Sequence, residues 1–138
     1  MKSSLTTGLA ATQRITVDRD RTIGFMGEAA RVYATPRLVH DIEHACRDLL
    51  LAHLDPGEDS VGARVELDHL APTLPGMSVE IAVTIAAVEG RRVTFAVTAR
   101  DAIDEIGRGS HTRFIVDKAR TERRLAEKTQ RAKAAGAL

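Results

Sequence analysis

Three residues whose side chains could act together on a carbonyl group lie in one helix-like segment and at the end of the strand-like segment that follows it. Glu43 stands inside the stretch YATPRLVHDIEHACRDLL, from Tyr33 to Leu50, where apolar residues recur at helical spacing. Thr35 precedes a proline, so a helix is predicted to begin there, and His69 ends the alternating stretch SVGARVELDH. A carboxylate, an imidazole and a hydroxyl are groups that general acid–base and nucleophilic chemistry use.

Glu43 occupies an unusual place for a charged residue. On a helical wheel it lies at the edge of an apolar arc, between Cys46, Leu50 and Leu54. That arc holds Leu38, Val39, Ile42, Cys46, Leu49 and Leu50, and the charged arc holds Arg37, His40, Asp41, His44, Arg47 and Asp48. A buried carboxylate without a partner costs several kcal/mol or takes up a proton, so this position calls for an explanation.

His69 is predicted to face the same core as Glu43. It continues the alternation of Val61, Ala63, Val65 and Leu67. Two such groups could relieve each other by a hydrogen bond, directly or through water, and would form a site in a partly dry pocket. The helix N-terminus at Thr35 adds free N–H groups for an anionic oxygen. Simpler roles stay open: Thr35 as a helix cap, Glu43 reaching water, and His69 as a structural residue.

The remaining elements alternate with the period of strands. QRITVDRD reads as a first strand, DPG at residues 55–57 ends the helix, and EIGRGSHTRFIVD reads as the last strand. In that strand Gly107 and Gly109 let another backbone approach. The stretch joined at EGRR forms two strands whose inward residues are Val79, Ile81, Val83 and Ile85, then Val93, Phe95 and Val97. One strand, one long helix and four antiparallel strands predict an α+β fold, with the sheet curled around the helix as in the hot-dog arrangement.

Composition narrows the class of protein. The length of 138 residues suits one domain, predicted here over residues 1–117 and followed by a charged tail, 118–138, as a solvated helix or frayed end. A net charge of +1 gives no general attraction to nucleic acid or membrane. No secretory signal or long apolar span is evident, and the single Cys46 excludes an internal disulfide, so we expect a cytoplasmic protein.

Two other reactive groupings are weighed against this site. HDIEH places His40 and His44 four residues apart, as in the zinc motif H-E-x-x-H, but with Asp41 in place of the glutamate. Both histidines fall on the charged arc and no third ligand is evident, so no metal site is predicted. Cys46 lies on the apolar arc without a neighbouring cation, so its thiol is expected to stay protonated and inert.

From about Tyr33 to Arg113 the chain resembles the hot-dog thioesterases of the fluoroacetyl-CoA thioesterase type. The marks are AT before the helix, E-x-A-C within it, LxPGEDSVG, HLAPTLPG, VEGRR and DEIGRGSH. The resemblance implies a hot-dog fold and hydrolysis of a small acyl-CoA thioester to a carboxylate and a free thiol. It also implies no cofactor beyond the coenzyme A thioester itself, and a homodimer with the site near the subunit interface.

The resemblance also implies roles for single residues. Glu43 would be the base or nucleophile toward the thioester carbonyl, and His69 would polarise that carbonyl or protonate the departing thiolate. Thr35 would position Glu43 or the attacking water. For the substrate, the resemblance implies contacts from Tyr33, from the backbone N–H of Gly62 and from the guanidinium of Arg113.

One departure from the family affects specificity. The fluoroacetyl-specific enzyme carries two phenylalanines in a lid before the helix, and ungapped counting matches them to Met26 and Ala29, which leaves Tyr33 as the aromatic residue nearby. We therefore expect a different or broader acyl preference. A hot-dog domain that binds acyl-CoA without cleaving it is the alternative, because the fold does not dictate activity. The acyl chain and the thiol carrier, coenzyme A or a carrier protein, stay open.

Overall fold

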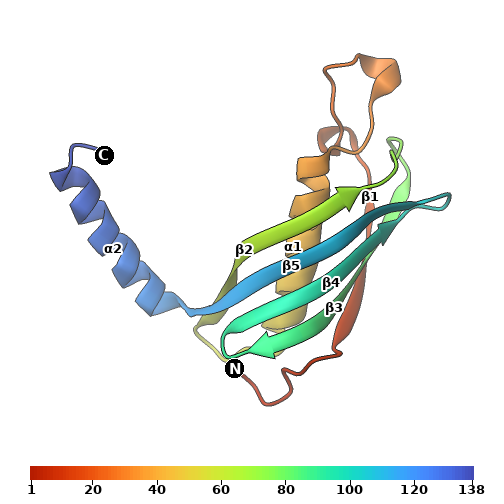
Figure 1. Cartoon of the computed structure of the whole chain (residues 1–138). Helices are drawn as coiled ribbons and strands as arrows, with labels where there is room; N and C mark the ends of the chain where they lie inside the picture. The colour runs from red at the N-terminus through yellow and green to blue at the C-terminus, as the bar shows by residue number, and fades with distance from the viewer.

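A five-stranded antiparallel sheet wraps around one long helix in the computed structural model, which describes residues 1–138 (Figure 1). The helix α1 spans Thr35–Leu51 and lies along one face of the sheet. The strand order is β1-β3-β4-β5-β2. The strands are β1 (Ala10–Thr16), β2 (Glu58–His69), β3 (Ser78–Glu89), β4 (Arg92–Arg100) and β5 (Glu105–Asp117). The α+β hot-dog arrangement predicted from the sequence is thus confirmed.

The core forms where the inward side chains of the sheet meet the apolar arc of α1. All seven inward residues predicted for β3 and β4 are buried. They pack in one cluster with Leu38, Ile42, Cys46 and Leu50 of α1. Because strand side chains alternate with a period of two and helix side chains with a period of 3.6, both patterns could be read from the sequence.

The first half of β2 departs from the predicted alternation. Val61 is 48% exposed and Ala63 is also exposed, although both were expected to face the core. The register against β5 shifts between Gly62 and Arg64, which marks a β-bulge at Ala63. The extra residue reverses the alternation, so Gly62 faces inward before the bulge. After the bulge the half-buried positions are Val65, Leu67 and His69, as predicted.

Gly109 confirms the expected close approach of two backbones. A Cβ atom built there would lie 1.8 Å from the carbonyl oxygen of Glu66 on the paired strand β2. Gly107 differs, because a Cβ there would first meet the side chain of Leu38, at 3.2 Å. The glycine at 109 therefore holds β5 against the bulged strand β2, which carries His69 at its end.

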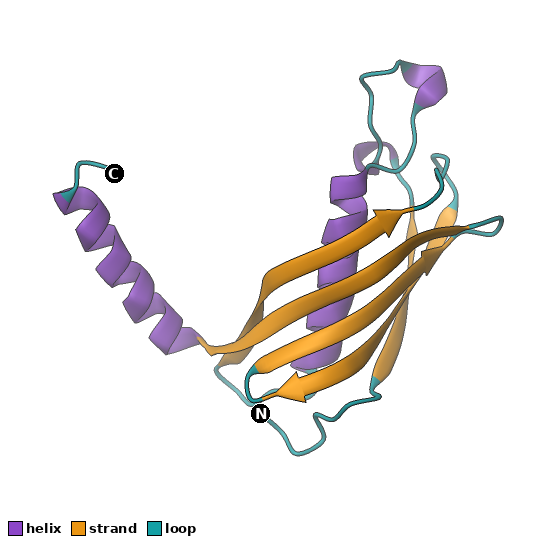
Figure 2. Cartoon of the chain, viewed as in Figure 1, coloured by secondary structure: helices purple, strands orange, loops and turns teal.

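Two features leave the body of the fold. Residues 17–34 form a loop with two short 3-10 turns, η1 (Arg19–Arg21) and η2 (Glu28–Ala30), which stands beside the N-terminus of α1 (Figure 2). The helix α2 (Lys118–Ala134) follows β5 directly and projects away from the sheet, with no buried residue (Figure 1). No helix is long and apolar enough to cross a bilayer.

Candidate functional site

The hydroxyl of Thr35 is joined to His69 rather than to the backbone of its own helix. Thr35 Oγ1 and His69 Nδ1 lie 2.7 Å apart and form a hydrogen bond. The N-cap of α1 is Ala34, which has no side-chain cap, so the prediction of Thr35 as N-cap is wrong. The end of β2 and the start of α1 thus bring these two predicted site residues together.

The imidazole of His69 keeps one nitrogen free in a buried place. Its Nε2 atom is buried and has no hydrogen-bond partner within the chain. Burial lowers the pKa of His69 below its ordinary value, because desolvation penalises the charged form. The Tyr33 ring meets the imidazole edge-on, with ring centroids 6.4 Å apart. A neutral imidazole with one orphaned nitrogen is therefore available at the start of α1.

Asp41 binds the loop of residues 17–34 beside Thr35 and His69. The helical wheel placed this residue on the charged arc, but its carboxylate is buried. Asp41 is only 5% exposed and accepts a hydrogen bond from the phenol of Tyr33 at 2.5 Å. Arg21 donates to both oxygens of the same carboxylate, from Nε at 2.9 Å and from the second guanidinium nitrogen at 3.1 Å. Burial, followed by the bond to Asp41, raises the pKa of Tyr33. Residues 17–34 are thereby fastened to α1.

An apolar cavity of about 570 Å³ opens in front of Thr35 and His69. No charged residue lines it. Neither Met26 nor Ala29, the positions matched by ungapped counting, belongs to its wall, whereas Phe25 does and is 83% exposed. The prediction that Tyr33 is the only aromatic residue near the lid is therefore wrong. The wall consists of Ile23, Phe25, Val32, Tyr33, Ala34, Thr35, Pro36, His69, Leu70, Ala71 and Pro72.

Glu43 lies in a second group of polar residues, around Gly62. A Cβ atom built on Gly62 would lie 3.1 Å from Glu43 Oε1, 3.3 Å from His111 Cε1 and 3.6 Å from a terminal nitrogen of Arg113. Glu43 itself is half-buried and has no ion pair within 4 Å. The absence of a side chain at position 62 leaves space between a carboxylate and a guanidinium.

Arg113 is held rigidly in this second group. It is 5% exposed and donates to Ser60 Oγ and to the Ser60 carbonyl, both at 2.8 Å, and to His111 Nε2 at 3.1 Å. Because a guanidinium only donates, His111 accepts at Nε2, and its Nδ1–H donates to the Arg64 carbonyl at 2.9 Å. Burial and then the charge of Arg113 lower the pKa of His111, which fits a neutral ring. No pattern in the sequence indicates this role of His111.

The two groups do not meet within one chain. Glu43 follows Thr35 by eight residues, which is a rise of about 12 Å along an α-helix. Of the two contacts that the sequence allowed between Glu43 and His69, direct or through water, the direct hydrogen bond is not formed, since His69 Nε2 has no partner in the chain. Arg113 and Gly62 stand beside Glu43, whereas Tyr33 stands beside Thr35 and His69. A single chain in this conformation therefore does not form a site that combines all of these residues.

The other two groupings singled out from the sequence, Cys46 and the pair His40 and His44, form no reactive site in the chain. Cys46 is buried, and burial raises the pKa of its thiol to about 12, as expected for an inert core cysteine. His40 and His44 are exposed and lie with ring centroids 4.1 Å apart. No three His, Cys, Asp or Glu side chains gather in a metal-binding arrangement.

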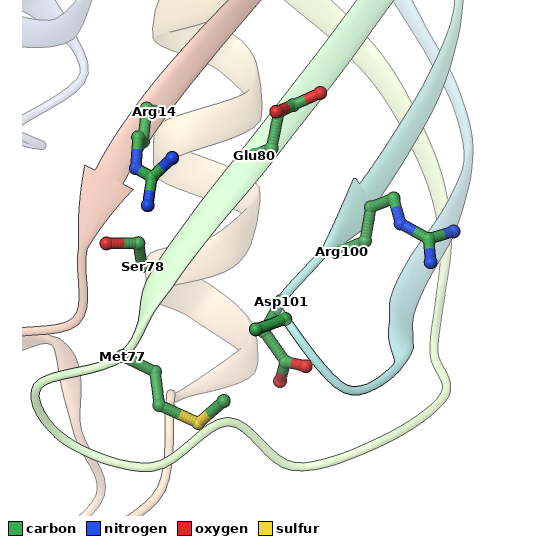
Figure 3. A pocket seen from close by; sticks show the side chains of 7 residues that line it. Arg14, Met77, Ser78, Glu80, Arg100 and Asp101 are labelled. Carbon is green, nitrogen blue, oxygen red and sulfur yellow. The ribbon is translucent and has the colours of Figure 1, made fainter.

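A further hollow lies at the ends of β1, β3 and β4, away from these groups (Figure 3). Arg14 and Glu80 come from paired positions of β1 and β3, and Arg100 points away from Arg14. Asp101 there is already bonded to the backbone N–H groups of residues 103 and 104 and to the Thr73 hydroxyl. Its carboxylate fixes the turn between β4 and β5.

Comparison with known proteins shows which family the chain belongs to. The family model described as fluoroacetyl-CoA-specific thioesterase matches residues 17–119. The chain belongs to this thioesterase family. A fluoroacetyl-CoA thioesterase from Streptantibioticus cattleyicolor is 32% identical over 136 residues, which cover 94% of this chain and 98% of that protein. The thioesterase described here is therefore a thioester hydrolase, which sets aside the alternative of a domain that only binds.

Solved structures agree with this family assignment. A crystal structure of a variant of the fluoroacetyl-CoA-specific thioesterase has a TM-score of 0.84 and 31% identity, and the match covers 92% of this chain and 99% of that one. A thioesterase superfamily member from Thermus thermophilus has a TM-score of 0.87 and 32% identity, covering 96% and 98%. The thioesterase is thus similar over nearly its whole length to hot-dog enzymes, and its activity is the hydrolysis of acyl-CoA thioesters.

Proposed function

We propose that the protein hydrolyses a small acyl-CoA thioester at a site shared between two copies of the chain. Thr35 and His69 of one subunit would face Glu43, Gly62 and Arg113 of the other. The observation that carries this proposal is the buried, unpartnered Nε2 of His69 at the end of β2, in a chain that keeps the candidate base Glu43 elsewhere. A buried polar atom without a partner is rare and calls for one.

The free edge of β2 supports a homodimer. β2 is the outermost strand of the sheet and runs for 12 residues without a neighbour on one side. Long bare edges are avoided in natural proteins, and pairing with a second copy covers them. An antiparallel pairing of two β2 strands centred on Val65 puts His69 opposite Val61 of the partner subunit. That places His69 next to Gly62, and hence next to Glu43, of the partner subunit.

The chemistry follows from the groups that this pairing brings together. Glu43 takes a proton from water, whose oxygen attacks the thioester carbonyl carbon. Alternatively, the Glu43 carboxylate attacks that carbon itself, and water later hydrolyses the anhydride that forms, which releases the acid and restores Glu43. The Thr35 hydroxyl donates to His69 Nδ1, so the proton of the neutral ring sits on Nε2. This N–H donates to the carbonyl oxygen as negative charge develops there. The carbon–sulfur bond then breaks and the thiolate takes up a proton, which in the first route is the proton that Glu43 removed from water. The acid product ionises, and a carboxylate and a free thiol leave.

Gly62 and Arg113 are proposed to hold the acyl group. The space that a side chain at position 62 would fill is bordered by Glu43 and by the Arg113 guanidinium, which is fixed by Ser60 and His111. A fixed donor needs no rearrangement as charge develops, which is the basis of electrostatic stabilisation in enzymes. Tyr33 contributes its ring to the wall and turns its hydroxyl away to Asp41.

Coenzyme A is the thiol carrier that the comparisons favour, and a short acyl group suits the cavity. A crystal structure of a variant of the fluoroacetyl-CoA-specific thioesterase holds fluoroacetate and CoA. In this chain the cavity wall is apolar, and Phe25 stands at its rim in place of the two matched lid positions. We therefore propose short acyl groups as substrates, with fluoroacetyl one member of the series. A thioester substrate and a lone reduced cysteine support a cytoplasmic location, and no metal or further cofactor enters the proposed reaction.

Release of free thiol from a panel of acyl-CoA substrates tests this function. The panel holds fluoroacetyl, acetyl, butyryl and phenylacetyl thioesters, and wild type runs beside Glu43→Gln and His69→Ala. Glu89→Gln, an exposed glutamate at the end of β3, is the matched control for loss of one carboxylate. We expect turnover by wild type and the control, and a fall in kcat of about 10²-fold or more in both site variants. Equal rates in Glu43→Gln and wild type would exclude Glu43 from the reaction.

A further inference from the structure

A groove lined by arginines lies where β5 passes into α2. It has a volume of about 330 Å³, and three arginines, Arg91, Arg120 and Arg124, border it together with the ring of Phe114. The other lining residues are Ile115, Val116, Asp117 and Thr121. Phe114 is 40% exposed, so one side of its ring is open to a ligand. Guanidinium groups bind phosphates, and an exposed aromatic ring stacks on a nucleobase.

The positive charge of α2 has no partner in the chain. The helix carries seven Lys or Arg side chains against two Glu, which is a net charge of +5, whereas the whole chain has +1. None of the seven lies within 4 Å of a carboxylate, since all ion pairs involve other cations. In the groove only Arg91 is paired, with Glu58 at 3.6 Å. Arg120 and Arg124 are therefore free to meet an anion.

We propose that this groove binds the phosphorylated adenosine end of the coenzyme A thioester, and this proposal rests on the proposed function. The substrate has an acyl end that carries no charge and a nucleotide end that carries several negative charges. The cavity at Thr35 and His69 has no charged residue in its wall, so it does not serve the nucleotide. The hollow in Figure 3 balances two arginines with two carboxylates, Glu80 and Asp101, whereas the groove has three arginines against Asp117 alone. The groove therefore attracts phosphate more strongly.

The length of the substrate indicates that the groove of one subunit serves the cavity at His69 of the other subunit. Within one chain, β2 begins beside the groove at Glu58 and ends at His69, about 36 Å away at 3.3 Å per residue. That is farther than extended coenzyme A reaches. When two β2 strands pair in antiparallel fashion, the start of one lies beside the end of the other. α2 leaves the sheet on the side of β2 (Figure 1), so in this pairing its residues Arg120 and Arg124 would lie toward the partner's cavity.

The test compares substrates that share the acyl group and differ in the nucleotide. Arg120→Glu combined with Arg124→Glu is assayed with an acyl-CoA, with the same acyl-dephospho-CoA, and with the acyl thioester of N-acetylcysteamine, which has no nucleotide. The same acyl group on an acyl carrier protein is the fourth substrate. Arg131→Glu combined with Lys133→Glu makes the same change of charge on the last turn of α2, outside the groove. Size-exclusion chromatography with light scattering checks that each variant keeps the assembly of wild type.

We expect KM for acyl-CoA to rise about tenfold or more in the groove variant, with kcat little changed. The effect should be smaller for dephospho-CoA and absent for the N-acetylcysteamine thioester, and the control pair should behave like wild type. In wild type, added salt should raise KM for acyl-CoA and leave that of the truncated thioester unchanged. This pattern separates binding of the nucleotide from any effect on the fold.

Three results would overturn the proposal. Unchanged KM for acyl-CoA in the groove variant, with wild type active, removes the groove from substrate binding and leaves the proposed function intact. Equal losses on acyl-CoA and on the truncated thioester, or a change of assembly, make the arginines structural or subunit contacts. Sensitivity confined to an acyl carrier protein substrate makes α2 a docking helix for an acidic protein. If wild type turns over none of these thioesters, the proposed function itself fails.

Discussion

Replacement of Asp41 by alanine is expected to loosen the cavity wall at a measurable cost in stability. The Asp41 carboxylate is buried and accepts one hydrogen bond from Tyr33 and two from Arg21. These bonds attach residues 17–34 to α1. The Tyr33 ring in turn meets His69 edge-on, so loss of the carboxylate reaches the proposed site through that ring.

The expected loss of stability follows from the two groups that lose their partner, the Tyr33 phenol and the Arg21 guanidinium. A buried phenol that loses its acceptor costs about 1–3 kcal/mol. The Arg21 side chain is 23% exposed and keeps its bond to Asp18 at 2.9 Å, so water and Asp18 offset much of its loss. We therefore expect Asp41→Ala to lower the free energy of unfolding by about 2–4 kcal/mol. Tyr33→Phe, which leaves Asp41 paired with Arg21, should cost about 1 kcal/mol.

Urea unfolding of the wild type, both single variants and the double variant measures these costs. If the phenol and the carboxylate interact as described, the double variant is less destabilised than the sum of the singles, with a coupling energy of about 1 kcal/mol. Asp48→Ala, on the exposed side of the same helix, is the control for loss of a carboxylate. A cost below about 0.5 kcal/mol for Asp41→Ala, or additive single variants, would refute this account of Asp41.

Three further predictions concern the site and its support. Gly62→Ala places a Cβ 3.1 Å from the Glu43 carboxylate, so kcat for acyl-CoA should fall about tenfold or more with little loss of Tm; unchanged kcat would show that this space is not used. Gly109→Ala places a Cβ 1.8 Å from a backbone carbonyl oxygen, so the free energy of unfolding should fall by about 3 kcal/mol or more; a Tm like that of wild type would contradict the close approach. Burial lowers the pKa of His69 below 6.5, so the unfolded chain binds this proton more tightly than the folded one. The free energy of unfolding should therefore fall as pH is lowered through about 6.5. It should fall less in His69→Gln, in which His111 is the remaining histidine whose pKa is lowered by burial. Equal pH dependence in both proteins would contradict a desolvated His69.

The sheet and the central helix could be predicted because their side-chain periods are strong and agree with each other. The buried residues of β3 and β4 alternate without interruption, and the apolar arc of α1 meets them. The β-bulge at Ala63 could not be predicted, because an inserted residue leaves the types of its neighbours unchanged. It reverses which of Val61 and Gly62 faces inward, and so decides what stands beside Glu43.

Contacts between distant segments explain the other differences. Asp41 lies on the polar side of the helical wheel, and only the fold brings Arg21 and Tyr33 over it. Thr35 has the sequence of a helix cap, and only the end of β2 gives its hydroxyl a different partner. Phe25 was missed because ungapped counting fixes positions in a loop, where a shift of one residue costs little. Glu43 and His69 were each singled out from the sequence as unusual, and no direct hydrogen bond between them is formed within one chain.

Mixing two inactive variants tests the shared site most directly. His69→Ala and Glu43→Gln are each purified, combined in equal amounts, unfolded and refolded together, and assayed for release of thiol from an acyl-CoA. If each site takes His69 from one subunit and Glu43 from the other, half of the dimers are mixed and each has one intact site. The account then predicts recovery of about a quarter of the wild-type activity. If both residues act within one subunit, every site in the mixture carries a lesion, and no activity above that of the separate variants would return.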